Sequence, residues 1–358
     1  MKYILLLYCL VISFTFLAQV ERNSSEQTPA KKASPAVKQD SQSLQDEIVP
    51  NKSVQENRSQ QILDATRFLS TQKNATAYSV QERADLIKEL ARTNPNSAEY
   101  YFNVYLASGR KNADVGLLKK AYEKTPTDIN VLEEMAGNAV RTNQLTSAKK
   151  YLKELMTSGS LDLDLVNYFK DLFQLAPKNS VLIFHGFDDS YNALYVQQIL
   201  LVRPDIKIIN LDWLTISDYR AELKNNGFFV PSEITVNPDY LRDFIDKNPT
   251  KSMGVSLTLP KAYLEKLPHN ATVIGTAFWT NTKPPSNSNL SDFTFIMSKP
   301  KNEEGISWAK NYLPFLYNYR NQLLTNKDTN GAKAIENKMI EIGKWNNQQT
   351  KISSVLQQ

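Results

Sequence analysis

The spacing of hydrophobic and polar residues changes near residue 177. Before this point apolar residues recur three or four positions apart, as on amphipathic helices. The clearest stripe is formed by Ala84, Leu86, Ile87, Leu90 and Ala91. After it, short apolar runs alternate with helical segments, which is typical of α/β domains. We therefore expect a helical domain over residues 56–176 and an α/β domain over residues 177–300.

The predicted helices of the first domain form pairs. Residues 97–128 and 129–160 each contain two amphipathic segments around a short polar turn, and Pro95 and Pro126 stand at the boundaries. Small residues occupy the expected helix contacts, namely Ala121, Ala136, Ala139 and Ala148. A repeat of about 31 to 34 residues with such contacts predicts two to three tetratricopeptide-like hairpins, with a generic helical bundle as the alternative. Arrays of this kind offer a surface to other chains.

The second domain begins with a buried strand, "SVLIFHG" (180–186), and continues with strands "DIKIINLD" (205–212) and "SMGVSLTL" (252–259). Helices separate these runs, and residues 271–279 and 292–298 are predicted as a fourth and a fifth strand. This alternation predicts a parallel, right-handed, three-layer α/β (Rossmann-like) domain. Residues 301–358 return to a helical pattern and are predicted as C-terminal helices forming a hairpin.

The N-terminus predicts export. A single lysine precedes a long apolar run that ends at Ala18, so residues 1–18 read as a signal peptide, with an uncleaved membrane anchor as the alternative. Residues 19–55 are rich in Ser, Gln, Lys, Glu and Pro and are predicted to be a disordered linker. We expect an exported protein of the periplasm or cell envelope. The chain has one cysteine, Cys9, inside the apolar run, so the processed chain would contain no disulfide.

Charge narrows the choice of partners. The net charge of +5 arises from 42 basic and 37 acidic residues, and basic residues cluster only in short pairs such as Lys31-Lys32 and Lys149-Lys150. This distribution makes no case for a nucleic acid partner. A membrane partner is expected only if the N-terminal segment stays uncleaved.

Polar residues follow the first three predicted strands. They are His185, Asp188, Asp189, Asn210, Asp212, Trp213, Ser256 and Thr258. Because ligands of open parallel sheets bind outside the carboxyl ends of the strands, the first six are candidate binding residues for a sugar or another polar ligand. The alternatives are structural: Asp188 and Asp189 suit a helix N-terminus, and Trp213 suits a core.

Catalytic patterns are incomplete. An α/β-hydrolase requires a Gly-x-Ser-x-Gly elbow, but the nearest segment, Gly254 to Thr258, lacks the second glycine. The chain has neither a dinucleotide-binding nor a Walker motif, and its two histidines, His185 and His269, lie in no metal-ligand pattern. We therefore predict no catalytic residue, no metal and no cofactor. A hydrolase using His185 and Ser256 is the remote alternative.

A family resemblance is carried by two segments, "SVLIFHGFDDSYNALYVQQILLVRPDIKIINLDWLTISDY" and "SMGVSLTLPKAYLEKL". They resemble the soluble C-terminal region of a Bacteroidota family of multi-pass membrane proteins that look like protein O-mannosyltransferases and often carry tetratricopeptide repeats. The matching pieces are Arg203-Pro204-Asp205, Asn210-Leu211, Gly186 and Asp189, whereas His185, Phe187 and Ser190 depart from the family's turn. The resemblance implies a stand-alone, exported form of this accessory segment.

Two functions follow as expectations. The first is a non-enzymatic envelope scaffold whose tetratricopeptide-like hairpins hold a protein partner. The second is a glycan-binding or polar-ligand-binding accessory module that uses the strand ends.

Overall fold

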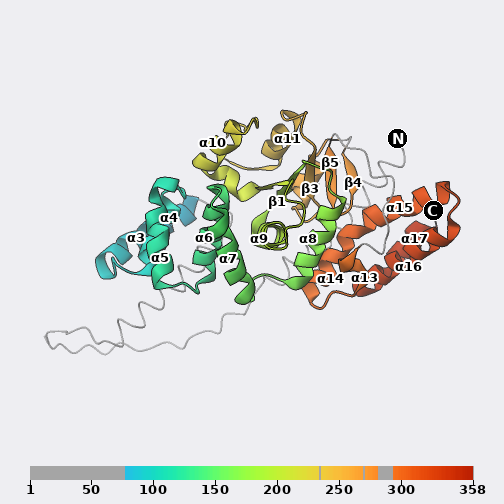
Figure 1. The fold of residues 1–358 in the computed structure, drawn as a ribbon, viewed down its shortest axis with the longest axis horizontal. Helices are drawn as coiled ribbons and strands as arrows, with labels where there is room; N and C mark the ends of the chain where they lie inside the picture. The colour runs from blue at the N-terminus through green and yellow to red at the C-terminus, as the bar shows by residue number, and fades with distance from the viewer. Residues whose placement is uncertain (1–76, 234, 269–270, 281–292, 358) are drawn as a thin grey trace, which may run out of the picture.

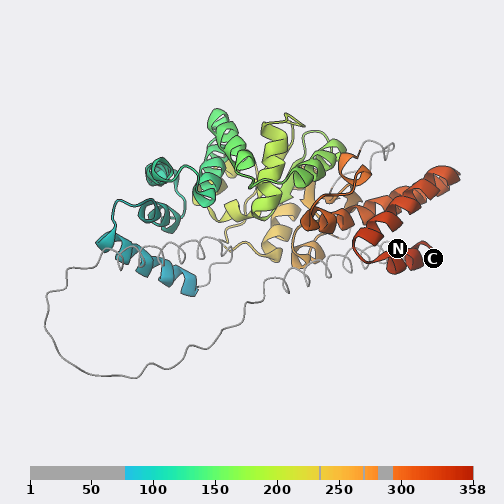
Figure 2. The same ribbon diagram turned by 90° about the horizontal axis from the view of Figure 1, so that it is seen from below.

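The structure is a computed structural model that describes residues 77–233, 235–268, 271–280 and 293–357. The predicted signal peptide (1–18), the linker (19–55) and the start of the helical domain (56–76) lie outside the described residues. The described part is elongated. Figure 1 and Figure 2 show helical hairpins at one end, a sheet in the middle and C-terminal helices at the other end.

The predicted hairpins are present. Helix α3 (Ala77–Thr93) is followed by the pair α4 (Ala98–Ala107) and α5 (Val115–Lys124), and then by the pair α6 (Ile129–Arg141) and α7 (Leu145–Thr157). Side chains cap two of these helices, because Ser97 accepts from the Tyr100 amide and Asp128 from the amides of Asn130 and Val131. The first pair and the start of α6 enclose a small separate core of Phe102, Tyr105, Leu106, Leu118, Ala121, Val131 and Met135.

Five short strands form one sheet in the order β2-β1-β3-β5-β4. Strands β1 (Val181–Phe184), β2 (Lys207–Asn210) and β3 (Met253–Ser256) are parallel, as predicted. The fully parallel arrangement is wrong, because β5 (Ala277–Thr280) runs antiparallel to β3 and to β4 (Thr272–Ile274). The predicted fourth strand is therefore two strands, which reverse at Gly275 with a φ of 60°.

The predicted fifth strand, residues 292–298, is also wrong. Residues Thr294–Met297 form the short helix α13, which packs on α8 (Leu163–Leu175). Its start is fixed by the buried Asp171, whose carboxylate accepts the Phe295 amide at 2.9 Å. A short apolar run bounded by turns fits a buried helix as well as a buried strand, so periodicity alone could not decide.

Helices cover both faces of the sheet. In Figure 1, α8 and α9 (Gly186–Gln198) lie below the strands, whereas α10 (Ser217–Asn225) and α11 (Pro238–Asp246) lie above them. The three-layer arrangement is thus confirmed. One continuous core joins the sheet, the inner side of α6 and α7, and the C-terminal helices. The hairpins are therefore built onto the α/β layers through a shared core.

The helix after β1 is followed by an irregular turn. Helix α9 ends at Gln198, and the chain then turns with positive φ at Leu201 (57°) and Arg203 (52°). The guanidinium of Arg203 donates to the carbonyl oxygens of Phe173, Ala176 and Pro177, at the end of α8, and pairs with Asp205. This arginine holds the pKa of Asp205 well below its usual range.

The C-terminal segment is helical, as predicted. It contains α14 (Glu303–Ala309), α15 (Leu313–Thr325), α16 (Thr329–Trp345) and α17 (Gln349–Leu356). Helices α15 and α16 form the expected hairpin, and Leu313, Phe315, Leu316, Ile335, Met339 and Ile342 join the main core. Within the part of the chain that the structure describes, no helix has the length and apolarity that crossing a bilayer requires.

Candidate functional site

The carboxyl ends of the three parallel strands meet at one edge of the sheet. Register pairing sets Phe184 of β1 beside Asn210 of β2, and Ile183 beside Val255 of β3. The predicted polar residues of these strand ends are therefore brought into one neighbourhood. Their carboxylates, however, are largely used within the protein.

Asp212 is the centre of one group at this edge. One carboxylate oxygen accepts the Gly186 amide at 3.0 Å, and the other lies 3.4 Å from Nε2 of His185. The Asn210 side chain accepts the Asp212 amide at 2.7 Å and so fixes the turn after β2. Asp212 thus ties the end of β2 to the start of α9. Both side chains of this pair stay partly exposed, His185 at 27% and Asp212 at 36%.

A second group surrounds Asp189. Its side chain is buried, and the hydroxyl of Thr258 donates to its carboxylate. Thr258 Oγ1 lies 2.6 Å from Oγ of the fully buried Ser256. Asp188 and Asp189 both stand in the first turn of α9, where carboxylates stabilise a helix. Asp188 is half-buried beside this group. The two aspartates therefore have structural roles.

Trp213 faces the hairpins and lies within a core. Its indole is 5% exposed and packs edge-on against Tyr191 and Tyr219. The guanidinium of Arg141, from α6, lies 5.3 Å from the centre of the ring. A side chain at Gly137 would meet the Tyr191 hydroxyl at 2.6 Å, so the close approach of the two domains requires a glycine there. Trp213 therefore lies in a packed core, in agreement with the structural alternative.

The described residues do not assemble the hydrolase set. His185 contacts Asp212, whereas Ser256 is fully buried and contacts Thr258, and the two share no hydrogen bond. In the same described ranges, no three His, Cys, Asp or Glu side chains converge as metal ligands.

A pocket lies where the hairpins meet the α/β domain. Its volume is about 320 Å³, and it is lined by Asn112, Arg141, Thr142, Asn143, Ile216, Asp218, Tyr219 and Glu222. The first four belong to the turns and helix ends of the hairpins, and the last four follow β2. The Asn112 amide donates to the Asp218 carboxylate at 2.8 Å across this junction. The pocket thus lies between the hairpins and the segment that follows β2.

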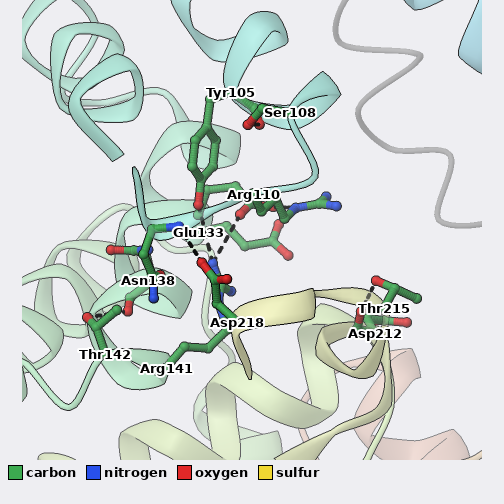
Figure 3. A network of polar contacts seen from close by, with 12 residues as sticks. Tyr105, Ser108, Arg110, Glu133, Asn138, Arg141, Thr142, Asp212, Thr215 and Asp218 are labelled. Atoms are coloured by element: carbon green, nitrogen blue, oxygen red, sulfur yellow. Dashed lines mark hydrogen bonds and ion pairs between the residues drawn. The ribbon is translucent and has the colours of Figure 1, made fainter. Parts of the chain in front are cut away.

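A partly buried ionic network supports one wall of the pocket (Figure 3). Arg110 donates to Glu134 at 2.6 Å, and the second oxygen of Glu134 lies 3.9 Å from Arg141. Arg141 also donates to the Tyr105 hydroxyl at 3.3 Å. Across the junction, the hydroxyl of Tyr191 donates to the backbone oxygen of Glu133. Arg141 is thereby held in one orientation beside the indole.

The network shifts the pKa values of its members in opposite directions. The Glu134 carboxylate holds the pKa of Arg110 above its ordinary value, so the pair stays ionised. Burial, assisted by Glu134, raises the pKa of Tyr105 to about 12. Burial also lowers the pKa of Arg83, which lies near Arg110. The interior of the hairpins therefore favours a neutral tyrosine and an ionised arginine–glutamate pair.

The pocket residues were missed by the sequence interpretation because they come from separate segments. Arg141 gave one usable signal, since it falls on the buried stripe of α6, where an arginine is uncommon. Asn143 gave another, because an asparagine between two helical segments is typical of a left-handed turn, and its φ is 55° in the structure. Neither signal points to Asp218 or Glu222. Only the tertiary fold brings these two residues into the same pocket as Arg141 and Asn143.

Comparison of the chain with protein-family models, with curated proteins and with solved structures gave no match.

Proposed function

We propose that this protein is an exported, non-enzymatic scaffold that binds an acidic partner protein through its tetratricopeptide-like hairpins. One observation carries the proposal. Helices α5 and α7 together contain six lysines and two glutamates, so they hold a charge of +4 within a chain whose net charge is +5.

Tyrosines lie among these lysines and give the face an apolar component. Lys120 stands 5.2 Å from the centre of the Tyr101 ring, and Lys150 stands 5.1 Å from that of Tyr122. Tyr122 and Tyr151 pack edge to face at 5.3 Å and bridge the two hairpins. We call these five residues the lysine–tyrosine face. The Tyr122 hydroxyl raises the pKa of Lys150, so this lysine stays charged.

Such a face suits a protein partner. Tyrosine is enriched at the centre of protein interfaces, and complementary charge steers a partner toward its site. The three tyrosines are half-buried and the two lysines are exposed, so the rings are already ordered before a partner arrives. An acidic, extended segment would meet both features together.

The test is a charge reversal on the face. Lys120→Glu with Lys150→Glu should reduce the partner retained from envelope extract at least tenfold, and binding to the unaltered chain should weaken steeply between 0.15 and 0.5 M salt. The matched control is Lys327→Glu with Lys344→Glu, which reverses two exposed charges of the C-terminal segment, one in the α15–α16 turn and one on α16. Equal retention by both double variants would refute the proposed face.

The strand-end edge supports a second candidate function, binding of a glycan or another polar ligand. The observation that favours it is the pair of His185 and Asp212, whose side chains are both partly exposed, at 27% and 36%. His185→Ala should then weaken binding of a glycan panel while leaving the lysine–tyrosine face functional. A panel that binds His185→Ala and the unaltered chain equally would exclude this edge.

A further inference from the structure

The pocket at the junction is a separate candidate site, independent of the lysine–tyrosine face. It opens between the α6–α7 turn and the start of α10, and its volume of about 320 Å³ is at the lower end of small-molecule sites. A ligand of this pocket is therefore small. Its walls come from two structural units, so an occupant would contact both.

The charges in the wall are mostly neutralised within the protein. Arg141 is compensated by Glu134 at 3.9 Å, and its guanidinium lies over the Trp213 ring. Glu222 is compensated by Lys207 at 3.2 Å. Neither side chain therefore presents an uncompensated charge to a ligand.

Asp218 differs from both. One of its oxygens accepts the Asn112 amide, and the other lies 3.5 Å from the Ser217 hydroxyl. Among the residues that the structure describes, no cationic side chain pairs with Asp218. An ionised carboxylate can only accept hydrogen bonds, so its complement is a donor, and a cationic donor gains the most.

The remaining wall suits the body of such a ligand. Ile216 and the Tyr219 ring are buried and offer apolar surface beside Asp218. Asn112 and Asn143 are exposed at the rim, where their amides can donate or accept. Carbon atoms can therefore lie on the floor while polar groups meet the rim.

We propose that this pocket binds a small aliphatic amine, with the ammonium group on Asp218 and the carbon chain against Ile216 and Tyr219. The amine bridges the hairpins and the α/β domain, since Asp218 also holds the Asn112 amide.

Three probes with the same four-carbon chain separate the ligand classes: putrescine, 1,4-butanediol and succinate. Each is titrated into the full chain by isothermal calorimetry. Putrescine should bind, and its affinity should exceed that of the diol and of succinate at least tenfold. Equal or tighter binding of the diol or of succinate would overturn the amine assignment, as would absence of putrescine binding.

Variants then locate the site. Asp218→Asn keeps an acceptor for the Asn112 amide and should weaken putrescine binding at least tenfold, with an unchanged circular dichroism spectrum. Glu222→Gln should have a smaller effect, because Lys207 already compensates that carboxylate. Asp85→Asn, on α3, removes the same charge from an exposed position and is the matched control. Putrescine binding that Asp218→Asn leaves intact would overturn the proposal.

Discussion

The strand-end edge and the junction pocket are both polar, yet their carboxylates do different things. At the strand ends Asp212 accepts the Gly186 amide, and Asp189 accepts a hydrogen bond from Thr258. At the junction, one oxygen of Asp218 has, among the described residues, no partner closer than a hydroxyl at 3.5 Å. The parallel strands therefore bring polar residues together at one edge, but most of these residues form hydrogen bonds within the protein. A ligand needs polar groups that are not already engaged in this way.

The largest expected effect concerns Arg141, in the wall of the pocket. Arg141→Ala removes a buried cation from Glu134, Tyr105 and Trp213 at once, and should lower the free energy of unfolding by about 3 kcal/mol in urea titrations. Arg92→Ala, at a mostly exposed position on α3, is the control and should change it by less than about 0.5 kcal/mol. Similar losses in both variants would mean that the network does not join the two domains.

Alkaline pH tests the same network through Tyr105. Its pKa in the folded protein is about 12, above the ordinary value of 10.0. The stability from the neutral hydroxyl is thus complete below pH 10 and is lost as pH rises toward 12 and beyond. By pH 12 the loss should reach about 2 kcal/mol.

Tyr105→Phe should remove this part of the alkaline decline, measured as the free energy of unfolding between pH 9 and pH 12. Tyr100→Phe is the control, because that ring is only half-buried on the same helix. If the two variants declined in parallel, burial of the Tyr105 hydroxyl would not be the cause.

Asp189, at the strand-end edge, should show a stability effect, because its carboxylate is used within the protein. Asp189→Ala leaves Thr258 and the buried end of α9 without their carboxylate, and should lower the free energy of unfolding by about 1.5 kcal/mol. Asp188→Ala, at the half-buried neighbour, should change it by less than about 0.5 kcal/mol. Thermal and urea unfolding measure both. Equal losses would indicate that the first turn of α9 acts as one unit.

The smallest effect is expected at Asp218. Asp218→Asn retains the hydrogen bond from the Asn112 amide, so the free energy of unfolding should stay within about 0.5 kcal/mol of the unaltered chain. Urea unfolding without added ligand measures this. A loss as large as that of Asp189→Ala would end the contrast between the two regions, because Asp218 would then be structural as well.

Much of the fold could be predicted from the sequence, because most of its helices and strands follow from local patterns of apolar and polar residues. Helix stripes bounded by Pro95 and Pro126 located the hairpins, and three buried apolar runs located the parallel strands. The apolar pattern predicted the wrong element where an apolar run was short. Residues 271–280 fold as a hairpin around Gly275, and residues 294–297 fold as a helix, because packing on β3 and on α8 decided their form.

The candidate site could be predicted only in part. The strand-end residues were identifiable because parallel strands always present their carboxyl ends together. The contact of Arg203 with the end of α8, and of Trp213 with Arg141, depends on helices distant in sequence, and no local pattern reports such partners.

The sequence by itself determined the helices, the first three strands and the supply of polar groups at their ends, since these follow from periodicity and capping between near neighbours. The tertiary structure decided which charges are compensated and which face the solvent together. Lys120 and Lys150, which are distant in the sequence, come to lie beside the rings of Tyr101 and Tyr122, and Asp218 comes to face a pocket beside Arg141. The physical reason is that electrostatic interaction depends on distance in space, and packing sets that distance.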